Sequence, residues 1–445
     1  MIATIEIGAA LLGIYLLFRE VFIQRFANFI TTIFLLCYVP LLCVYPVVAR
    51  LMAGGAISIH ANGNGVLNDV TVYFVYQLAN YGILVMFLLL QQIGSRQSAS
   101  HLSSKPPNVA AYEVPLLVLM LCAGVLLYVQ STGLSVAELL VASRFEWFFN
   151  EDYSSFSSVV ASYLFSLTPV VIYFLAREKR RYWLLLVLVT ALLIFYGVLS
   201  KDRKWLIFMG SGLLAAVYMS SGRRLIITFK GFIALTLLAL ALAFWQVARD
   251  IVFNALVTDG GGVVANAKEM ATRLLTQGDL PYYFNASMTA IHMNINEDYS
   301  IPFGLVRRQL FFFLPVDYSL GLKIEDISAI FSDAIIGGDD IRRGNMPPGF
   351  FGLFVLSFGW FGGIILLSLF PLFLKMLDNI ARKDDGIVQI VIVSHALSAA
   401  LLLLRGDDSS ATYFIGFSIF LLCLLRLPRA VAVRAKYSTN PTSTS

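Results

Sequence analysis

A short connection in the middle of the chain concentrates positive charge between two apolar stretches. Residues 200–204 include Lys201, Arg203 and Lys204, so three of the five side chains are cations. Arginine binds phosphate bidentately through its planar guanidinium, and such a cluster suits an anionic group such as a lipid-linked pyrophosphate. The alternative is that these side chains reach into lipid head groups, with Asp202 as a local partner.

Further arginines, several of them adjacent in pairs, belong to the long segment 250–350 and its entry. They are Arg249, Arg273, Arg307, Arg308, Arg342 and Arg343. A diphosphate has more oxygens than one guanidinium satisfies, so adjacent arginines are suited to binding it. For the pair near residue 342, a solvated face that pairs with Asp339 and Asp340 is an equal alternative. Arg144, in the segment 131–158, is either a clamp on such a group or an ordinary surface residue.

Deprotonating a substrate hydroxyl requires a carboxylate or an imidazole within hydrogen-bond reach. Several carboxylates qualify by their place along the chain and none by spacing: Asp202, Asp250, Asp317, Glu325 and Asp326. His292 is a second kind of candidate base, although a lone histidine is more often structural. His395 falls inside an apolar run, where we expect it to make an interhelical hydrogen bond.

The elements that must position these residues are membrane helices. Of the 445 residues 58% are hydrophobic and 13% are charged, whereas a soluble domain has about 25% charged residues. The predicted class is an all-α, polytopic membrane bundle with about eleven spans. The predicted spans are 2–18, 30–49, 71–91, 114–129, 159–176, 183–199, 205–220, 231–247, 351–373, 387–404 and 413–425. Pro40, Pro46 and Pro169 are expected to kink the helices that contain them.

Lys and Arg predict the orientation, because cytoplasmic connections are enriched in them. They alternate along the chain so that the N-terminus is predicted outside and the C-terminus inside. The predicted organisation is a first group of helices (1–249), a large outer loop containing short helices (250–350), the last helices (351–427) and a disordered cytoplasmic tail (428–445). The cations at 200–204 then lie on the outer face, against the usual bias.

Nucleotide and metal chemistry is not indicated by any motif. The sequence contains no Gly-Lys-Ser/Thr phosphate loop, no His-Glu-x-x-His and no Cys-x-x-Cys, so no cofactor or metal is expected. The net charge of +5 belongs to short clusters between apolar runs and does not indicate a nucleic-acid partner. Energy for any reaction must therefore come from an activated bond of the substrate or from an ion gradient.

Three patches resemble the O-antigen polymerases, bacterial membrane enzymes that polymerise lipid-linked oligosaccharide repeat units. The connection within 197–205 resembles that family's small-residue-plus-arginine turn. The stretch Arg-Arg-Gln-Leu-Phe-Phe-Phe-Leu-Pro at 307–315, followed by Lys323, is similar to its arginine–aromatic–proline stretch in the large outer loop. The stretch 347–363, with Phe-Gly-x-x-Gly inside, resembles the re-entry into the next helix. The overall plan of helices and one late loop covers most of the chain.

The resemblance implies glycosyl transfer at the outer face of the bacterial inner membrane. The partners implied are undecaprenyl-pyrophosphate-linked oligosaccharides, membrane lipid and a polysaccharide chain-length regulator. The predicted catalytic residues are Arg203 and Arg308, with Asp250 and His292 as candidate bases. The predicted phosphate-binding or substrate-binding residues are Lys201, Lys204, Arg249, Arg307, Arg342, Arg343 and Arg144.

Other readings of the same features stay open. A flippase or transporter for the same lipid-linked sugars also needs cations at the outer face. The related O-antigen ligases share the plan but carry a histidine late in the large loop, and this chain has none between Tyr299 and Phe350. Glycosyltransferases that use polyprenyl-phosphate sugars carry an acidic pair in the first outer loop, where this chain offers only Asp69. A non-catalytic membrane subunit is the remaining alternative.

Overall fold

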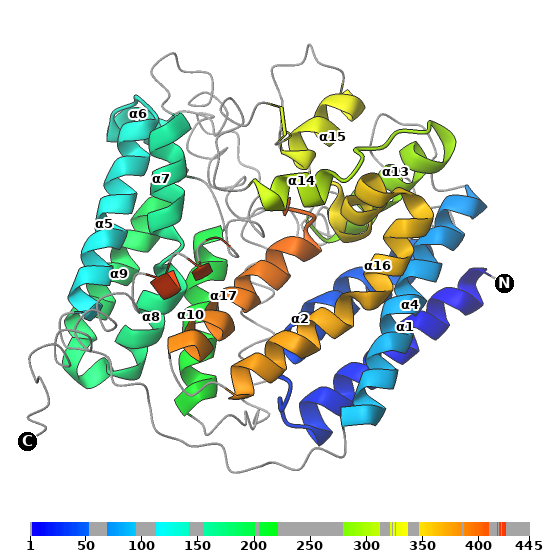
Figure 1. Cartoon of the computed structure of the whole chain (residues 1–445), viewed down its shortest axis with the longest axis horizontal. Helices are drawn as coiled ribbons and strands as arrows, with labels where there is room; N and C mark the ends of the chain where they lie inside the picture. Colours follow the sequence, from blue (N-terminus) through cyan, green and yellow to red (C-terminus); the bar gives the residue numbers. More distant parts are fainter. Residues whose placement is uncertain are drawn as a thin grey trace, which may run out of the picture.

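The computed structural model shows a bundle of helices, and every regular element in its described part is helical (Figure 1). It describes residues 2–52, 69–94, 113–141, 155–200, 204–220, 279–311, 321–322, 324, 326–336, 347–383, 387–408, 416, 418–419 and 421–423. The N-terminal elements are α1 (Ile2–Phe18), η1 (Arg19–Ile23), α2 (Phe29–Tyr38), η2 (Val39–Val44), α3 (Tyr45–Met52) and α4 (Val70–Gly94). The middle ones are α5 (Glu113–Ser131), α6 (Val136–Val141), α7 (Ser155–Phe165), α8 (Thr168–Arg177), α9 (Lys179–Ser200) and α10 (Lys204–Ser220). The last are α13 (Asp279–Asn296), α14 (Gly304–Leu310), α15 (Ile327–Ile336), α16 (Gly349–Lys383) and α17 (Ile387–Leu404).

The described helices have the length and composition of membrane helices. Five runs are long and apolar enough to cross a membrane: Phe29–Val48, Val70–Gln92, Val114–Ser131, Lys179–Gly197 and Gly349–Ala381. Their outer surfaces are apolar, because Trp183, Leu184 and Leu188 of α9 are each more than half exposed. The predicted all-helical class is therefore confirmed for the described residues, and these five runs agree with a membrane bundle by length and composition. The count of eleven spans is not confirmed, since 231–247 and most of 413–425 lie outside the described residues.

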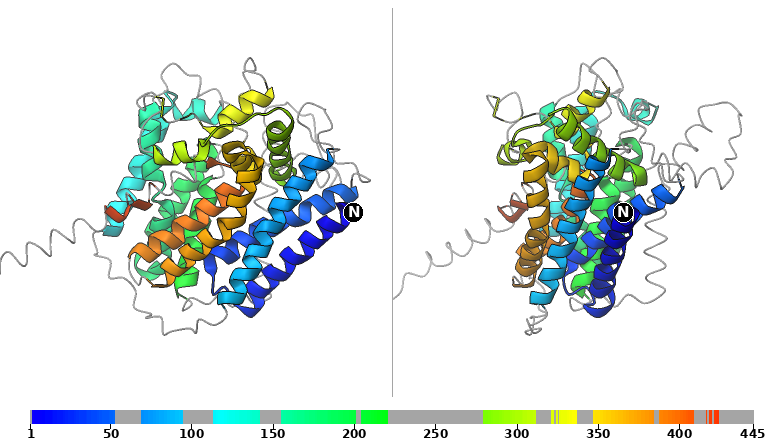
Figure 2. Two further views of the ribbon diagram at one scale, coloured as in Figure 1. Left: turned by 45° about the vertical axis from the view of Figure 1, so that its right-hand side comes forward. Right: turned by 90° about the vertical axis from the view of Figure 1, so that its right-hand side faces the viewer.

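The helices form two groups that α17 joins. Helices α5 to α10 lie on the left in Figure 1, and α1 to α4 lie on the right with α13 and α16. Helix α17 runs between the groups and packs against α2 and α16 on one side and α8 and α10 on the other. The rotated views in Figure 2 show the same arrangement. Helices α14 and α15 lie across the top end of the bundle, which we call the crown.

Two of the predicted kinks have a visible cause. Pro40 lies in the first turn of a π-helical segment, Val39–Val44, inside the long run from α2 to α3. Proline removes a backbone donor, and the chain absorbs the loss by adding a residue to the turn. Pro169 lies at the start of α8, after a break that separates it from α7.

Helix α16 differs from the single predicted span at 351–373. Gly359 has φ +72° and ψ 164°, a conformation essentially confined to glycine, and it divides the element. The two parts fold back on each other, since a Cβ added at Gly363 would lie 2.9 Å from the Cα of Val355. The rings of Phe350 and Phe370 are also only 5.2 Å apart. Residues 349–358 are thus a short helix that turns back, and the long part of α16 begins at Trp360.

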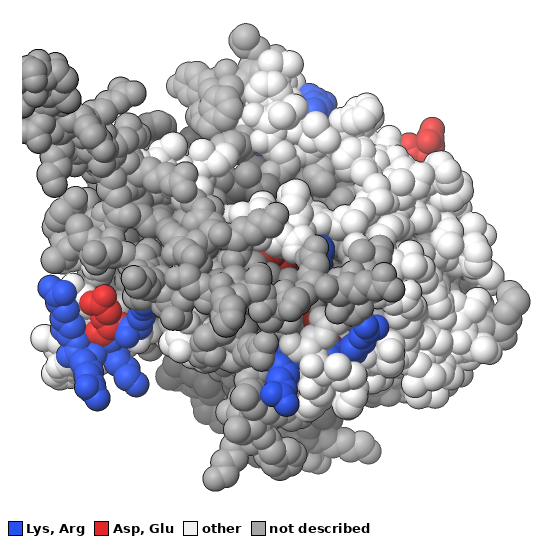
Figure 3. Space-filling model, turned by 60° about the horizontal axis from the view of Figure 1, so that its bottom comes forward, with Lys and Arg blue, Asp and Glu red and all other residues white. Residues whose placement is uncertain are grey.

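The end of the bundle opposite the crown is basic. Figure 3 shows this end, where blue basic side chains outnumber red acidic ones among the described residues. The connections α1–α2 and α8–α9 both lie at this end of the bundle (Figure 1), and the second contributes Arg177, Lys179, Arg180 and Arg181. This agrees with the prediction that these connections share one face.

Candidate functional site

Four of the predicted site residues have described side chains. They are His292 on α13, the pair Arg307 and Arg308 on α14, and the candidate base Asp326 just before α15. Arg144, Lys201, Arg203, Arg249, Asp250, Arg342 and Arg343 lie outside the described residues, and for Lys204 only the backbone at the start of α10 is described. The candidate site is therefore built from the crown.

Arg308 is buried and joins three separate parts of the crown. Its Nε lies 2.9 Å from Oδ2 of Asp408, which follows α17, and its Nη2 lies 3.5 Å from Oδ2 of Asp326. Its Nη1 donates a hydrogen bond of 3.1 Å to the carbonyl of Ile324. One guanidinium thus faces two carboxylates, and we call Arg308, Asp326 and Asp408 the crown cluster.

Local sequence explains why Asp326 stands at this place. Its Oδ1 accepts a hydrogen bond of 2.9 Å from the backbone N–H of Ser328 at the start of α15. Aspartate is a favoured residue before the first turn of a helix, because its oxygen satisfies an N–H that lacks a partner. The same carboxylate then presents its second oxygen to Arg308. Its side chain is 20% exposed, so it is the member of the crown cluster that solvent reaches.

Asp408 is placed by a close backbone contact between two glycines. Gly406, with φ +82°, turns the chain after α17, and a Cβ there would lie 2.5 Å from the backbone N of Gly349. The turn therefore rests directly on the start of α16, and no larger residue fits. This contact fixes the position of the turn and so places the Asp408 side chain, which is completely buried, in the crown cluster.

The surroundings of Asp408 favour its neutral form. Burial raises its pKa well above the ordinary value, and the nearby Asp326 carboxyl raises the pKa further, while Arg308 opposes both effects. Two carboxylates beside one cation reach neutrality when they share one proton. The crown cluster therefore combines a cation with a carboxyl pair that can give or take a proton.

Arg307 and His292 have partners outside the crown cluster. Arg307 donates to the backbone carbonyls of Gly321 (2.8 Å) and Leu322 (3.1 Å). His292 Nδ1 lies 2.7 Å from the amide nitrogen of Asn296, which also donates to Asp69 at 2.8 Å. The hydrogen bond from Asn296 to Asp69 is the largest cause of the lowered pKa of the Asp69 carboxyl. The described contacts of His292 are with Asn296, Asp69 and Glu297, and none of these is a member of the crown cluster.

Sequence reasoning named Arg308 and Asp326 but missed Asp408. In the sequence Asp408 belongs to a short turn after an apolar run, where an acidic residue is expected to be solvated. A usable signal was the motif Arg-Gly-Asp-Asp at 405–408, because a glycine followed by two acids at the end of a predicted span is an unusual concentration of charge.

Buried carboxylates elsewhere in the described bundle have structural partners. Glu6 pairs with Arg50 at 2.8 Å, and Glu20 accepts from Gln91 at 2.8 Å and from Asn28 at 3.2 Å. Glu6 lies inside the predicted first span, 2–18, and Glu20 lies just past it.

His395 is buried and bonds to Ser418 and to the carbonyl of Ser166, which confirms its predicted interhelical role.

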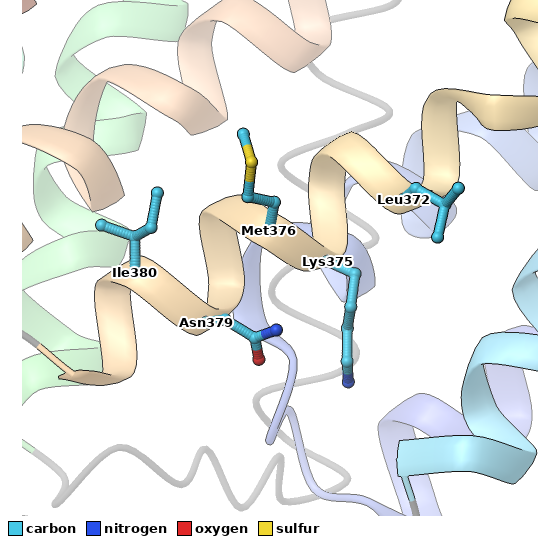
Figure 4. Close-up of a pocket in the computed structure, with 5 residues that line it drawn as sticks. All are labelled: Leu372, Lys375, Met376, Asn379 and Ile380. Carbon is cyan, nitrogen blue, oxygen red and sulfur yellow. The ribbon is translucent and has the colours of Figure 1, made fainter.

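A hollow of about 360 Å³ lies on α16 near the basic end, beside Leu372, Lys375, Met376, Asn379 and Ile380 (Figure 4). Its one charged lining residue, Lys375, already donates to Asn28 at 2.7 Å. The side chains come from a single helix and offer no carboxylate. This hollow is a weaker candidate site than the crown cluster.

Comparison of the chain with protein-family models, with curated proteins and with solved structures gives no match.

Proposed function

We propose that this chain is a membrane glycosyltransferase that joins undecaprenyl-pyrophosphate-linked oligosaccharide repeat units at the outer face of the bacterial inner membrane. The product is an O-antigen, a capsule or an exopolysaccharide. The observation that carries the proposal is the crown cluster, which brings an arginine of the predicted phosphate-binding stretch together with a proton-accepting carboxyl pair. The resemblance of three sequence patches to O-antigen polymerases supports the same reaction.

In this reaction the hydroxyl of an acceptor sugar attacks the anomeric carbon of the donor sugar. The bond from that carbon to the pyrophosphate oxygen breaks, and undecaprenyl pyrophosphate leaves. Asp326, the least buried member of the crown cluster, accepts the hydroxyl proton. Arginines of the outer face stabilise the negative charge that develops on the leaving group. Arg308 is a positioning residue, because it orients both carboxyls.

The test uses purified protein in lipid nanodiscs with lipid-linked repeat units extracted from the source strain. Chain extension is read as a ladder on a gel. We expect Asp326→Asn to lower the rate about 100-fold or more, as for loss of a general base. The matched control is Glu138→Gln, which changes an exposed carboxylate at the start of α6 and should leave the rate unchanged. An Asp326→Asn protein that folds and extends chains normally contradicts the assigned role.

A flippase for the same lipids is the second candidate, favoured by the buried carboxylates Glu6 and Glu20, since membrane carboxylates often carry protons in transporters. The same nanodisc protein, moved to liposomes, distinguishes the two functions. Translocation of the lipid without chain extension indicates a flippase. Transfer of the glycan to a lipid A core instead indicates a ligase.

A further inference from the structure

Helix α14 buries a charged side chain and exposes apolar ones, which is the reverse of a helix that faces water. It buries Gly304 and Arg308 on one side. On the other side it exposes Phe303 by 64%, Val306 by 39% and Leu310 by 63%. A surface helix in water shows the opposite arrangement, with its charged residues outward and its apolar ones inward. We call Phe303, Val306 and Leu310 the α14 stripe.

Among the described residues, the charged side chain next to the stripe is held by backbone carbonyls. Arg307 lies between Val306 and Arg308 in sequence, and its guanidinium donates to the backbone carbonyls of Gly321 and Leu322. Leu322 itself is 52% exposed, so it extends the apolar surface. Exposed apolar surface of this extent marks contact with lipid or with another protein.

The stripe continues into the surface that the long part of α16 presents. The backbone N–H of Phe303 donates to the carbonyl of Ser357 at 2.9 Å, and its ring lies 6.3 Å from that of Phe358. Immediately after the Gly359 turn, Trp360 is 44% and Phe361 is 65% exposed. The exposed apolar side chains then continue down α16, which is one of the five membrane-length helices. The α14 stripe is therefore the upper rim of a membrane-facing surface.

We propose that α14 is an interfacial helix whose stripe lies in the lipid leaflet at the crown end of the bundle. Aromatic residues at a membrane boundary and an apolar helix face of this kind are typical of interfacial helices. The inward side of the same helix then holds Arg308 at head-group depth. This inference rests on the membrane character of the bundle and does not require the proposed glycosyl transfer.

The test measures which medium reaches the stripe. Single cysteines replace Leu310 and, as a matched control, the exposed Ala334 of α15, in a protein whose native cysteines are changed to alanine or serine. Each cysteine carries a bimane fluorophore. The full chain is placed in phosphatidylcholine–phosphatidylglycerol nanodiscs. One quencher is a lipid with a nitroxide near the head-group end of its acyl chain, and the other is aqueous iodide.

We expect the lipid quencher to reduce the fluorescence at position 310 at least about twofold more than iodide does, and the reverse at position 334. Equal access of iodide to both positions would overturn the proposal, because the stripe would then face water. Protection of position 310 from both quenchers would also overturn it, because protein would then cover the stripe. Size-exclusion profiles equal to that of the unmodified protein establish that both variants are folded.

Discussion

Removing the charge of Arg308 should destabilise the protein far more than a surface arginine would. In Arg308→Met the carboxyls of Asp408 and Asp326 lose their shared cation, and the side chain of Asp408 is 0% exposed. The two carboxyls with their one shared proton still carry one negative charge beside Arg308. Removing the cation from a buried pair costs about 3–5 kcal/mol, whereas an exposed pair contributes about 0–1 kcal/mol. Asp408→Asn keeps the shape of the neutral acid, leaves Arg308 with Asp326, and should cost about 1–3 kcal/mol.

The double variant Arg308→Met/Asp408→Asn separates the pair from its surroundings. It should lose about 2 kcal/mol less than the sum of the two single changes, because no charge at position 408 is then left unpaired. The free energy of unfolding is measured by titrating mixed micelles with dodecyl sulfate and following tryptophan fluorescence, for which the chain supplies five tryptophans. An Arg308→Met cost below about 1 kcal/mol together with simple additivity would refute the buried pair.

The pH dependence of the free energy of unfolding is a second test of the role of Asp408. Asp408 binds its proton more tightly in the folded state, because burial and Asp326 raise its pKa. The folded state then holds more protons than the unfolded state above about pH 4, the ordinary range of an aspartate. Stability contributed by this group is complete below that pH and falls as the pH rises toward the raised pKa. Asp408→Asn should remove that slope, and an unchanged slope would assign it to another group.

Two further changes test the helix contacts that hold the crown and the basic end in place. Gly359→Ala should cost about 1–3 kcal/mol of stability through backbone strain alone, because the added Cβ meets nothing within 4 Å. The control Gly362→Ala lies in helical backbone and should be neutral or stabilising. Equal effects of the two changes would contradict the turn at Gly359. Asp378→Ala should cost about 2 kcal/mol or more, because its carboxylate accepts from the backbone N–H groups of Ile30 (2.9 Å) and Thr31 (3.2 Å), and Asp378→Asn should cost less. Hydrogen exchange at the amides of Ile30 and Thr31 should speed up in Asp378→Ala, and unchanged protection would exclude the cap.

The spans were predictable where charge bounds an apolar run. Residues 2–18 and 387–404 were predicted with the bounds that α1 and α17 have, since Arg19 and the Asp384–Asp385 pair interrupt the apolar pattern there. The break in α16 was not predictable in this way. Hydropathy is uniform across Gly359, and only the backbone dihedral angles of that residue divide the run into two helices that fold back on each other.

The crown cluster was predictable only in part, for a reason of the same kind. Arg308 and Asp326 were candidates by residue type and by their position in the long segment. Their partner Asp408 comes from a turn that a glycine-to-glycine contact carries onto the start of α16. Gly349 and Gly406 lie 57 positions apart in the sequence. A backbone contact over that separation produces no periodic pattern of residues from which it could be predicted.

The cap that Asp378 places on α2 has a consequence for how the chain is made. The N–H groups of Ile30 and Thr31 receive their acceptor from a residue 347 to 348 positions later. At a synthesis rate of about 5–20 residues per second, the ribosome needs roughly 20 to 70 s to reach that residue. During this interval the start of α2 depends on water or lipid head groups for its hydrogen bonds. Helix α2 is therefore synthesised long before its cap is available, and fragments that stop before residue 378 should be preferred targets of membrane proteases.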